Sequence, residues 1–423
     1  MWSFSTDPDF QKELDWIDAF VREEIEPLDS ILGNQWDIHA PNFIKLVRPL
    51  QQRVRERGLW ACHLGPALGG KGYGQLKLAL MNEKFGRSRF GPIVFGSQAP
   101  DTGNAEILAH YGTSVQKERF LKPLLANEMV SCFVMTEPQG GADPLVLQTK
   151  AELEGGEWVI NGEKWFASNA KFAGFFIVMA VTDPDASPYR RMSMFIVSAD
   201  TPGIEIIRNH GFYGEPENTH AHMRWSNVRV PIENMLGERG DAFVVAQVRL
   251  GGGRMHHAMR TIAKATRAFD MMCERAVSRF TKGEQLSQKQ MVQEKIADSW
   301  VELRQFRLLV LETAWLADQG HDWKSLRKNV AAVKAIMPKL LHDIAARALH
   351  IHGSLGISHE MPFAEWVIDS FHVGLADGPT EVHKVTLARE LLKDVKPAKG
   401  LFPDYMGYVQ EARAPEKYGG NEI

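Results

Sequence analysis

Hydrophobic residues near the N-terminus recur at helical spacing. Phe10, Leu14, Ile17 and Val21 lie three or four positions apart, which places them on one face of a helix, and the Asp-Pro pair before them is typical of a helix start. Similar patterns run through FIKLVRPLQQRVRERG, LKLALMNEKFGRS and SVQKERFLKPLLANE. The pattern therefore predicts a mainly helical region over residues 1–130.

After about residue 130 the pattern changes to short runs of β-type residues. The stretch AELEGGEWVINGEKWFAS holds two hairpin signals, Gly-Gly and Asn-Gly, between runs rich in Val, Ile, Trp and Phe. FFIVMAVT, MSMFIVSAD and AHMRWSNVRV are further predicted strands, separated by Pro, Asp and Gly turns. Residues 131–236 are therefore expected to form a compact β domain.

Long helical patterns return in the last part of the chain. They are interrupted by TKGEQ, DQGHDW and HGSLGISHEMP and cover residues of about 241–278, 286–318, 327–352 and 380–394. The final residues, with their Pro and Gly, are expected to form a tail. The order of helix, sheet and helix predicts an α+β fold with domains at 1–130, 131–236 and 237–395, and a tail at 396–423.

Composition and charge are those of an ordinary globular protein. Hydrophobic residues make up 44% and charged residues 24% of the 423 positions. Lys plus Arg number 49 against 52 Asp plus Glu, so the chain as a whole exerts no electrostatic pull on nucleic acid or on an acidic membrane. Cys62, Cys132 and Cys273 form no CxxC, which favours neither a disulfide framework nor a zinc site.

The two ends of the sequence carry no recognisable targeting signal. The N-terminus has no basic segment followed by an apolar run, its acidic residues disfavour a transit peptide, and the C-terminal NEI is not a peroxisomal signal. No apolar stretch approaches the roughly 18 residues of a membrane span. With the unpaired cysteines, these features predict a cytoplasmic protein without a membrane span.

Several apparent motifs are better explained as structural. GPALGGKG, residues 65–72, has the glycines and lysine of a phosphate loop but Gly72 where a Ser or Thr must hold magnesium. No GxGxxG follows a strand and opens a helix, so nicotinamide chemistry is unsupported. His256-His257 and Cys62-His63 lack further ligands at metal spacing, and no metal site is expected.

Two stretches are more informative. In FVMTEPQGGAD, residues 133–143, an apolar strand runs into a loop whose glycines let the backbone approach a flat or charged ligand, although a plain strand exit explains it as well. In EKWFASNA, residues 163–170, the aromatic Trp165 and Phe166 stand beside the hydroxyl of Ser168. That combination suits a planar heterocycle, and a buried aromatic pair is an equal alternative.

A third stretch, GLADGPTEVH, places the carboxylate of Asp377 among small and turn-forming residues just before a helical pattern. An Asp in this position commonly caps the following helix by accepting hydrogen bonds from its first N–H groups. The same carboxylate would also be available as a base. Both interpretations stay open on the residues alone.

Taken together and in this order, TEPQGGAD, WFAS and ADGPTEVH resemble motifs of the acyl-CoA dehydrogenase family, whose members use FAD. The resemblance covers about residues 1–395. It implies an N-terminal helical domain, a middle β-barrel domain and a C-terminal four-helix bundle. The last motif is closest to a branch that reads ADGPxEVH, which includes vertebrate members fused to a phosphotransferase-like domain.

The resemblance also implies how FAD is held without a covalent bond. Phe133, Met135 and Thr136 would contact the pyrimidine edge of the flavin, and Ser168 would bring a hydroxyl near its N5 atom. Ala142 departs from the Ser that is usual in the family. The cofactor residues implied within these two motifs are Phe133, Met135, Thr136, Gly141, Ala142, Phe166, Ala167 and Ser168.

Further cofactor contacts are implied in the helical half. Arg279 and Gln290 keep the register in which the family's arginine reaches the FAD pyrophosphate of a neighbouring subunit, and a guanidinium can donate two parallel bonds to a diphosphate. A later loop would approach the adenosine half of FAD across a subunit contact. The resemblance therefore implies a homodimer or homotetramer. The implied residues of this half are Arg279, Gln290, His350, Gly353, Thr380 and Glu381.

The family's reaction is the α,β-dehydrogenation of an acyl-CoA thioester, in which a carboxylate takes the α-proton and the β-hydrogen leaves as hydride to flavin N5. Asp377 would be that base, because the other position that the family uses is Gly253. Ala142, Arg254 and Gly378 would contact the substrate. An electron-transfer flavoprotein is the implied electron acceptor, and fatty-acid or related acyl-CoA catabolism the implied role.

Two alternatives come from relatives of this fold. A nitroalkane-oxidase-like enzyme would also use Asp377 as its base, but would pass electrons to oxygen. A flavin-containing nucleic-acid binder would belong to a different functional class, and the nearly balanced charge disfavours it.

Overall fold

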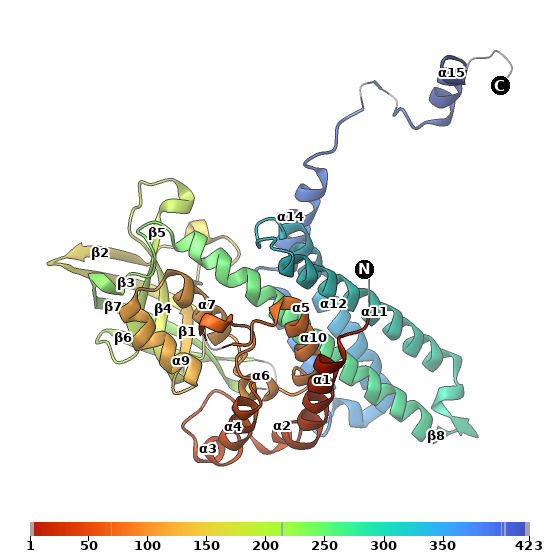
Figure 1. Ribbon diagram of the computed structural model, residues 1–423, viewed down its shortest axis with the longest axis horizontal. Coiled ribbons are helices and arrows are strands. Elements are labelled where there is room, and N and C mark those ends of the chain that lie inside the picture. Colours follow the sequence, from red (N-terminus) through yellow and green to blue (C-terminus); the bar gives the residue numbers. More distant parts are fainter. Residues whose placement is uncertain (1–3, 69, 213–214, 399, 402, 419–423) are drawn as a thin grey trace.

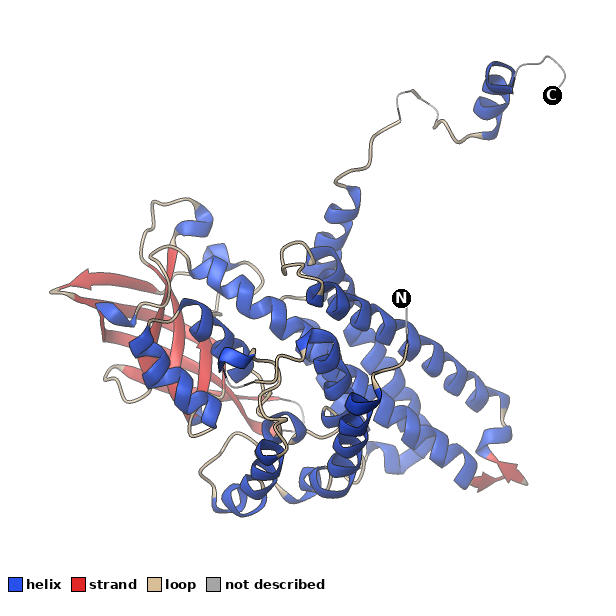
Figure 2. Cartoon of the chain, in the orientation of Figure 1, coloured by secondary structure: helices blue, strands red, loops and turns tan. Residues whose placement is uncertain are grey.

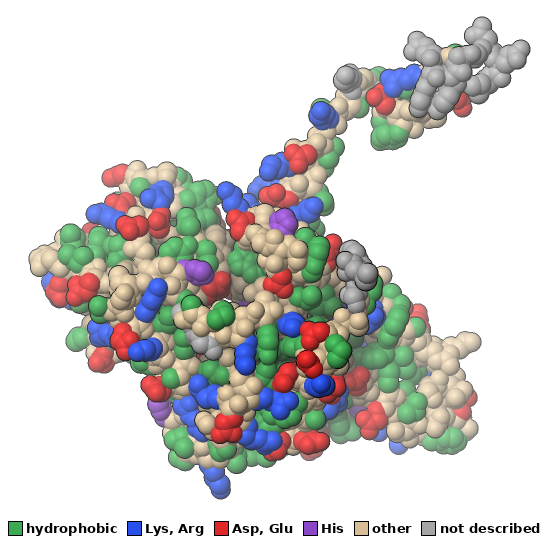
Figure 3. Space-filling view, viewed as in Figure 1, with side chains coloured by type: hydrophobic (Ala, Val, Ile, Leu, Met, Phe, Trp, Pro, Cys, Tyr) green, Lys and Arg blue, Asp and Glu red, His purple; other side chains and the backbone are tan. Residues whose placement is uncertain are grey.

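The computed structural model describes residues 4–68, 70–212, 215–398, 400–401 and 403–418 (Figure 1). A helical N-terminal part, a β-sheet and a second helical part follow one another along the chain, which confirms the predicted α+β fold (Figure 2). Charged side chains of both signs lie interspersed on the face shown in Figure 3. None of the helices formed by the described residues combines the length and apolarity that a membrane crossing needs.

Helix α1 begins where the sequence pattern predicts. Asp7 caps it by accepting a hydrogen bond from the N–H of Phe10 at 2.8 Å, and the predicted face, with Leu14 and Ile17, is buried. The helices of this part are α1 (Pro8–Phe20), α2 (Leu28–Ile31), α3 (Pro41–Leu46), α4 (Arg48–Glu56), α5 (Gly74–Phe85), α6 (Gly91–Val94), α7 (Asp101–Tyr111), α8 (Ser114–Gln116) and α9 (Lys122–Ala126).

Within the part of the chain that the structure describes, seven strands form one curled sheet. They are β1 (Val130–Val134), β2 (Lys150–Glu154), β3 (Glu157–Ser168), β4 (Ala173–Val181), β5 (Met192–Ser198), β6 (Ile204–Phe212) and β7 (Glu215–Pro231). β5 pairs with β4 on one side, while β1 and then β2 pair in parallel with its other side, and β3, β7 and β6 follow. These pairings run in an open order from β5 to β6, so the sheet is a half-barrel around its own apolar core.

One of the two hairpin signals is a turn and the other is not. Gly155 and Gly156 join β2 to β3, as predicted. The turn predicted at Asn161-Gly162 is wrong, because β3 continues through it and only its register against β7 shifts there. A Cβ at Gly162 would lie 2.5 Å from Thr149 Oγ1, so this glycine permits a close backbone approach within a bulged strand. Strand β6 had not been predicted.

The second helical part contains five packed helices: α10 (Ala242–Ser278), α11 (Gln290–Asp318), α12 (Arg327–His352), α13 (Phe363–Leu375) and α14 (Thr380–Leu392). A short hairpin of β8 (Phe280–Thr281) and β9 (Glu284–Gln285) joins the first two. The four predicted helices are confirmed, whereas α13 was missed because it follows a stretch rich in helix breakers. Helix α15 (Gly407–Tyr418) stands away from the body in Figure 1.

Helix α10 runs from the sheet to the core that the N-terminal and C-terminal helices share. Near its start, Val245 and Ala246 belong to the apolar cluster that covers the sheet. Farther along, Met255, Met259 and Ile262 belong to the core shared by the N-terminal and C-terminal helices. The segment between these clusters, which contains three consecutive glycines, therefore lies at the junction of the three parts.

Candidate active site

The Asp377 loop lies between α13 and α14 and beside α10. Arg254 Nε donates a hydrogen bond to the Asp377 backbone oxygen at 2.8 Å, and His383 Nε2 lies 3.3 Å from the same oxygen. Lys334 Nζ donates to two backbone oxygens at the end of α13, each at 2.7 Å. Side chains from α10, α12 and α14 thus hold the loop in one position.

The Asp377 carboxylate faces α10. Asp377 adopts a left-handed φ of 57°, a conformation that Asp tolerates better than most residues. Asp377 Oδ2 lies 3.7 Å from His257 Nε2, and a Cβ at Gly253 would lie 3.5 Å from the same oxygen. No side chain caps α14, whose N-cap is Pro379, so the interpretation of Asp377 as a helix cap is wrong.

Asp377 is ionised at neutral pH. Burial raises its pKa, but the positive field of His257 and Arg249, with Lys334 and Arg254 behind them, outweighs burial and holds the pKa below its usual value. Burial lowers the pKa of His257 to about 3, so this ring is neutral at pH 7 and the arginines and the lysine supply the field there. The loop therefore presents a carboxylate that is able to accept a proton.

Glu106 is a second carboxyl beside the same part of α10. A Cβ at Gly252 would lie 2.9 Å from Glu106 Oε2, just as the neighbouring Gly253 leaves room for Asp377. Burial raises the pKa of Glu106 to about 7, although Arg249 opposes this. Nothing in the sequence around Glu106 indicated a site, since its proximity to α10 arises only from the packing of α7 against it.

Replacing Glu106 with Gln is expected to stabilise the protein above pH 7 and to have little effect near pH 4.5. Because the pKa of Glu106 rises from 4.5 to about 7 on folding, the folded state keeps a proton that the unfolded chain releases in this window. The free energy of unfolding of the wild type therefore falls as the pH rises from 4.5 to 7 and stays lowered above it, by about 3 kcal/mol for the full shift.

Thermal unfolding of both proteins between about pH 4.5 and 8.5 will measure this difference. Glu118→Gln is the matched control, since the Glu118 side chain is 70% exposed. A difference in Tm between Glu106→Gln and the wild type that does not change with pH would contradict the assignment.

The two predicted cofactor motifs lie side by side. The backbone N–H of Trp165 donates to the backbone oxygen of Thr136 at 3.0 Å, and Lys164 Nζ donates to the backbone oxygen of Met135 at 2.8 Å. Lys164 also forms an ion pair with Glu137 at 2.8 Å, with side chains 0% and 2% exposed. This buried pair joins β3 to the loop after β1, and the sequence analysis missed it.

Phe166 presents its ring at the surface. It has a left-handed φ of 52°, it is 41% exposed, and it stacks on His210 with ring centroids 4.5 Å apart. The alternative of a buried aromatic pair is therefore wrong for Phe166. Ala167 is buried and Ser168 is half-buried, at the end of the same strand.

The remaining residues predicted near the reaction lie in the exposed loop after β1, in the half-buried Asp377 loop and at the start of α14. Gly141 and Ala142 are exposed, and a Cβ at Gly141 would lie 3.2 Å from Thr136 Cγ2. Beside Asp377, Gly378 has a φ of 102°. At the start of α14, the Thr380 hydroxyl donates to the Gly374 backbone oxygen at 3.2 Å, and Glu381 is exposed.

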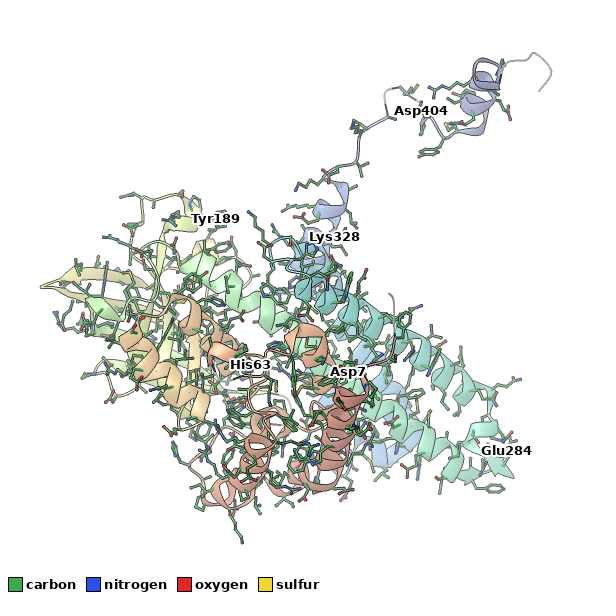
Figure 4. All side chains as sticks on the ribbon, in the orientation of Figure 1. Asp7, His63, Tyr189, Glu284, Lys328 and Asp404 are labelled. Atoms are coloured by element: carbon green, nitrogen blue, oxygen red, sulfur yellow. The ribbon has the colours of Figure 1, made fainter. Side chains whose placement is uncertain are left out.

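A second group of predicted cofactor residues lies at the far end of the helical part. Arg279 follows α10 and Gln290 begins α11, on either side of the hairpin that carries Glu284 at the tip in Figure 4. Arg254 and Arg279 are 25 positions apart (279 − 254), which corresponds to about 37 Å along the helix.

His350 and Gly353 end α12 near the same tip. Burial lowers the pKa of the neighbouring His352, and the charge of Arg275, near the end of α10, lowers it further. The ends of α10 and α12 are therefore close together. His350 and Gly353 are both exposed. One chain therefore does not bring this second group to Asp377.

His63 and His256, in two of the segments interpreted as structural, pack against each other. His63, labelled in Figure 4, is half-buried and His256 is buried; their ring centroids are 6.2 Å apart, and desolvation lowers the pKa of both. Over the described ranges, no group of three or more His, Cys, Asp or Glu side chains has the arrangement of a metal site.

Comparison with known protein families agrees with this arrangement. The acyl-CoA dehydrogenase N-terminal domain matches residues 8–128, the middle domain matches 132–228, and the C-terminal domain matches 240–392. The chain belongs to the acyl-CoA dehydrogenase family. Homologues in this family are oxidoreductases that act on the CH–CH group of acyl-CoA with FAD.

Two relatives are each 37% identical to this chain. Chicken acyl-CoA dehydrogenase family member 11 is 37% identical over 396 residues, which cover 90% of this chain and 50% of that protein, so the chain spans about half the length of such vertebrate relatives. The (R)-benzylsuccinyl-CoA dehydrogenase of Thauera aromatica is 37% identical over 383 residues, or 89% of this chain and 93% of that one. The branch expected from ADGPTEVH is thus confirmed.

Solved structures share the fold of this acyl-CoA dehydrogenase family member. A Mycobacterium abscessus protein named after the same family is 36% identical and has a TM-score of 0.84, covering 93% of this chain and all of the other. A glutaryl-CoA dehydrogenase in complex with glutaryl-CoA is 26% identical, with a TM-score of 0.79, over 93% of this chain and 98% of the other.

The residues of the two cofactor motifs around Thr136 and Ser168 fit FAD. Phe166 offers an exposed aromatic face, and Ser168 offers a hydroxyl two residues along the same strand. The exposed Gly141 lets the loop backbone approach a ligand without a side chain in between. A planar heterocycle with polar edges requires such a combination of stacking surface and hydrogen-bonding groups.

Proposed function

We propose that the protein uses FAD to remove the α- and β-hydrogens of an acyl-CoA thioester, with Asp377 as the base that takes the α-proton. The observation that carries this proposal is the ionised Asp377 carboxylate, which faces the side-chain-free Gly253 of α10. The chemistry that bound FAD would provide is to accept the β-hydrogen together with two electrons.

The protein's own residues have three tasks in this reaction. Asp377 accepts the proton, and its backbone N–H is assigned as a donor to the thioester oxygen, because an α-proton is acidic only when negative charge on that oxygen is stabilised. Arg254 holds the Asp377 carbonyl and so positions the base. Gly378, Ala142 and the outer face of Arg254 border the substrate.

This arrangement also accounts for an Asp where most of the family has Glu. A carboxylate that is displaced by about 1 Å can lose roughly a hundredfold in rate. Here Arg254, His383 and Lys334 fix the loop, and Gly253 keeps the facing helix free of a side chain, so the loop itself brings the shorter residue to the substrate.

For the cofactor, we propose that Phe133, Met135 and Thr136 contact the pyrimidine edge of the flavin, with the exposed Phe166 against its ring system and Ser168 near N5. Gly141, Ala142 and Ala167 would approach through their backbones, and Thr380 and Glu381 would approach from the start of α14.

We further propose a homodimer or homotetramer. Arg279, Gln290, His350 and Gly353 lie too far from Asp377 to complete the FAD site of their own chain, and would instead bind the FAD of a neighbouring copy. An electron-transfer flavoprotein as acceptor, a role in acyl-CoA catabolism and a cytoplasmic location complete the proposal.

Anaerobic mixing of the FAD-loaded protein with a panel of acyl-CoAs tests the reaction. The panel includes straight, branched and carboxylated acyl groups, since the named relatives act on benzylsuccinyl-CoA and glutaryl-CoA. At least one member is expected to bleach the flavin absorbance without an added acceptor. Bleaching by nitroalkanes alone, with hydrogen peroxide formed in air, would favour the oxidase alternative instead.

A further inference from the structure

Arg249 is a partly buried cation on α10, where this helix meets α7 and β1. Its Nε donates to Asn104 Oδ1 at 2.8 Å, and its Cζ lies 4.0 Å from the centre of the Phe133 ring. A Cβ at Gly103 would lie 2.9 Å from Arg249 Cγ, so α7 has no side chain at the point of closest approach. The surrounding elements thus fix both the stem and the plane of the guanidinium.

Arg249 has no direct ion pair. Among the described residues, no carboxylate oxygen lies within 4.0 Å of its guanidinium, and one hydrogen bond, to a neutral amide, is found. Burial lowers the pKa of Arg249, and the more distant Asp377 and Glu106 oppose this. Because no carboxylate in contact neutralises this partly buried charge, it favours an anion that binds or forms nearby.

The two cations that hold the Asp377 loop already have partners. Arg254 donates to the Asp377 backbone oxygen, and Lys334 donates to two backbone oxygens of the α13 end. Arg249 differs because the terminal N–H groups of its guanidinium make no hydrogen bond to a described residue. Its position over Phe133 places it next to the strand end that is proposed to hold the flavin.

We propose that Arg249 stabilises the negative charge that FAD acquires when it is reduced. This inference rests on the proposed function, in which Phe133 and the residues after it contact the pyrimidine edge. Positive charge near the flavin ring nitrogens makes the cofactor easier to reduce, and a partly buried cation does so more strongly than a fully exposed one.

The charge balance of the reaction explains the need for such a residue. The substrate loses a proton to Asp377 and a hydride to FAD, so Asp377 becomes neutral and FAD gains one negative charge. Before the reaction, the field of Arg249 acts on the ionised Asp377. Afterwards the same guanidinium faces an anionic cofactor, so one cation serves both states.

The test compares the midpoint potential of bound FAD in the wild type, Arg249→Met and Arg249→Lys, measured without substrate against a reference dye. For Arg249→Met we expect the ratio of reduced to oxidised FAD at a fixed dye potential to fall about tenfold, which is about 30 mV for a two-electron couple. Arg249→Lys should lie near the wild type. Arg239→Met is the control, since Arg239 is 54% exposed and pairs with Asp183.

Three results would contradict either the proposal for Arg249 or the proposed function. An unchanged potential in Arg249→Met, with a raised KM for carboxylated acyl-CoAs alone, would overturn the proposal and make Arg249 a substrate contact. If Arg249→Met fails to retain FAD, Arg249→Gln and Arg249→Lys are compared, and equal potentials in these two would overturn it. A wild-type protein without FAD would instead refute the proposed function.

Discussion

Replacement of Asp377 by Asn is expected to slow the reduction of bound FAD by an acyl-CoA by about a hundredfold to ten-thousandfold, the range that a positioned general base contributes. The amide has nearly the same shape but cannot take the α-proton. FAD should remain bound, because the loop is held through the Asp377 backbone oxygen and not through its carboxylate. Stopped-flow recording of flavin bleaching, with FAD content measured on the same sample, gives both quantities.

Two further variants separate the possible explanations. Glu106→Gln removes the other carboxyl beside α10, so loss of bleaching in Glu106→Gln with full activity in Asp377→Asn would make Glu106 the base. Asp377→Glu extends the carboxylate by one methylene, and a shift of about 1 Å should cost roughly a hundredfold in a loop that is fixed for Asp. Higher activity in Asp377→Glu would contradict the fitted loop.

Replacement of Lys164 by Met is expected to lower the free energy of unfolding by about 3–5 kcal/mol, because it leaves the buried Glu137 carboxylate without its cation. Lys164 is wholly buried, and it also holds the Met135 backbone oxygen, so the loop proposed to carry the flavin should loosen and FAD affinity should fall. Urea unfolding and a titration of the apoprotein with FAD measure these effects.

The double variant Lys164→Met with Glu137→Leu removes both charges and should recover much of the lost stability, since apolar residues of similar volume can replace a buried ion pair. Lys122→Met is the control for the loss of a lysine, because its pair with Glu118 has both side chains 70% exposed and is worth less than about 1 kcal/mol. Equal losses for Lys164→Met and Lys122→Met would refute a structural role of the buried pair.

Local patterns in the sequence were sufficient to predict most elements. Apolar spacing predicted α1 and the four long helices, since a helix that buries one face must repeat its apolar residues along that face. Asn161-Gly162 misled because pairing with β7 overrode the local turn preference and converted it into a bulge. Helix α13 was missed because the glycines and the proline before it dominated the local signal.

The residues that surround Asp377 could not be found in this way. Glu106 and Lys334 come from two helices far apart in the sequence and neither stands in a recognisable motif, whereas Gly253 and Arg254 were identified through the family resemblance. Lys164 lies within EKWFASNA but was missed, because a lysine is expected to be exposed and only the packing of the folded chain buries it. Arg249 was missed because its neighbours on α7 and β1 are far from it in the sequence. Asp377 and Phe166 were found because each stands in a short motif, one a carboxylate among turn-forming residues and the other an aromatic ring close to a small hydroxyl residue.

The three consecutive glycines of α10 have a consequence for motion. A Cβ at Gly251, Gly252 or Gly253 would meet Trp323, Glu106 or Asp377 respectively, so the helix gives up side chains here to admit its neighbours. Each glycine weakens a helix interior by about 1 kcal/mol relative to alanine. The 37-residue helix is therefore intrinsically weakest beside the base, and local unwinding there would withdraw Arg254 from Asp377 while the rest of the protein stays folded.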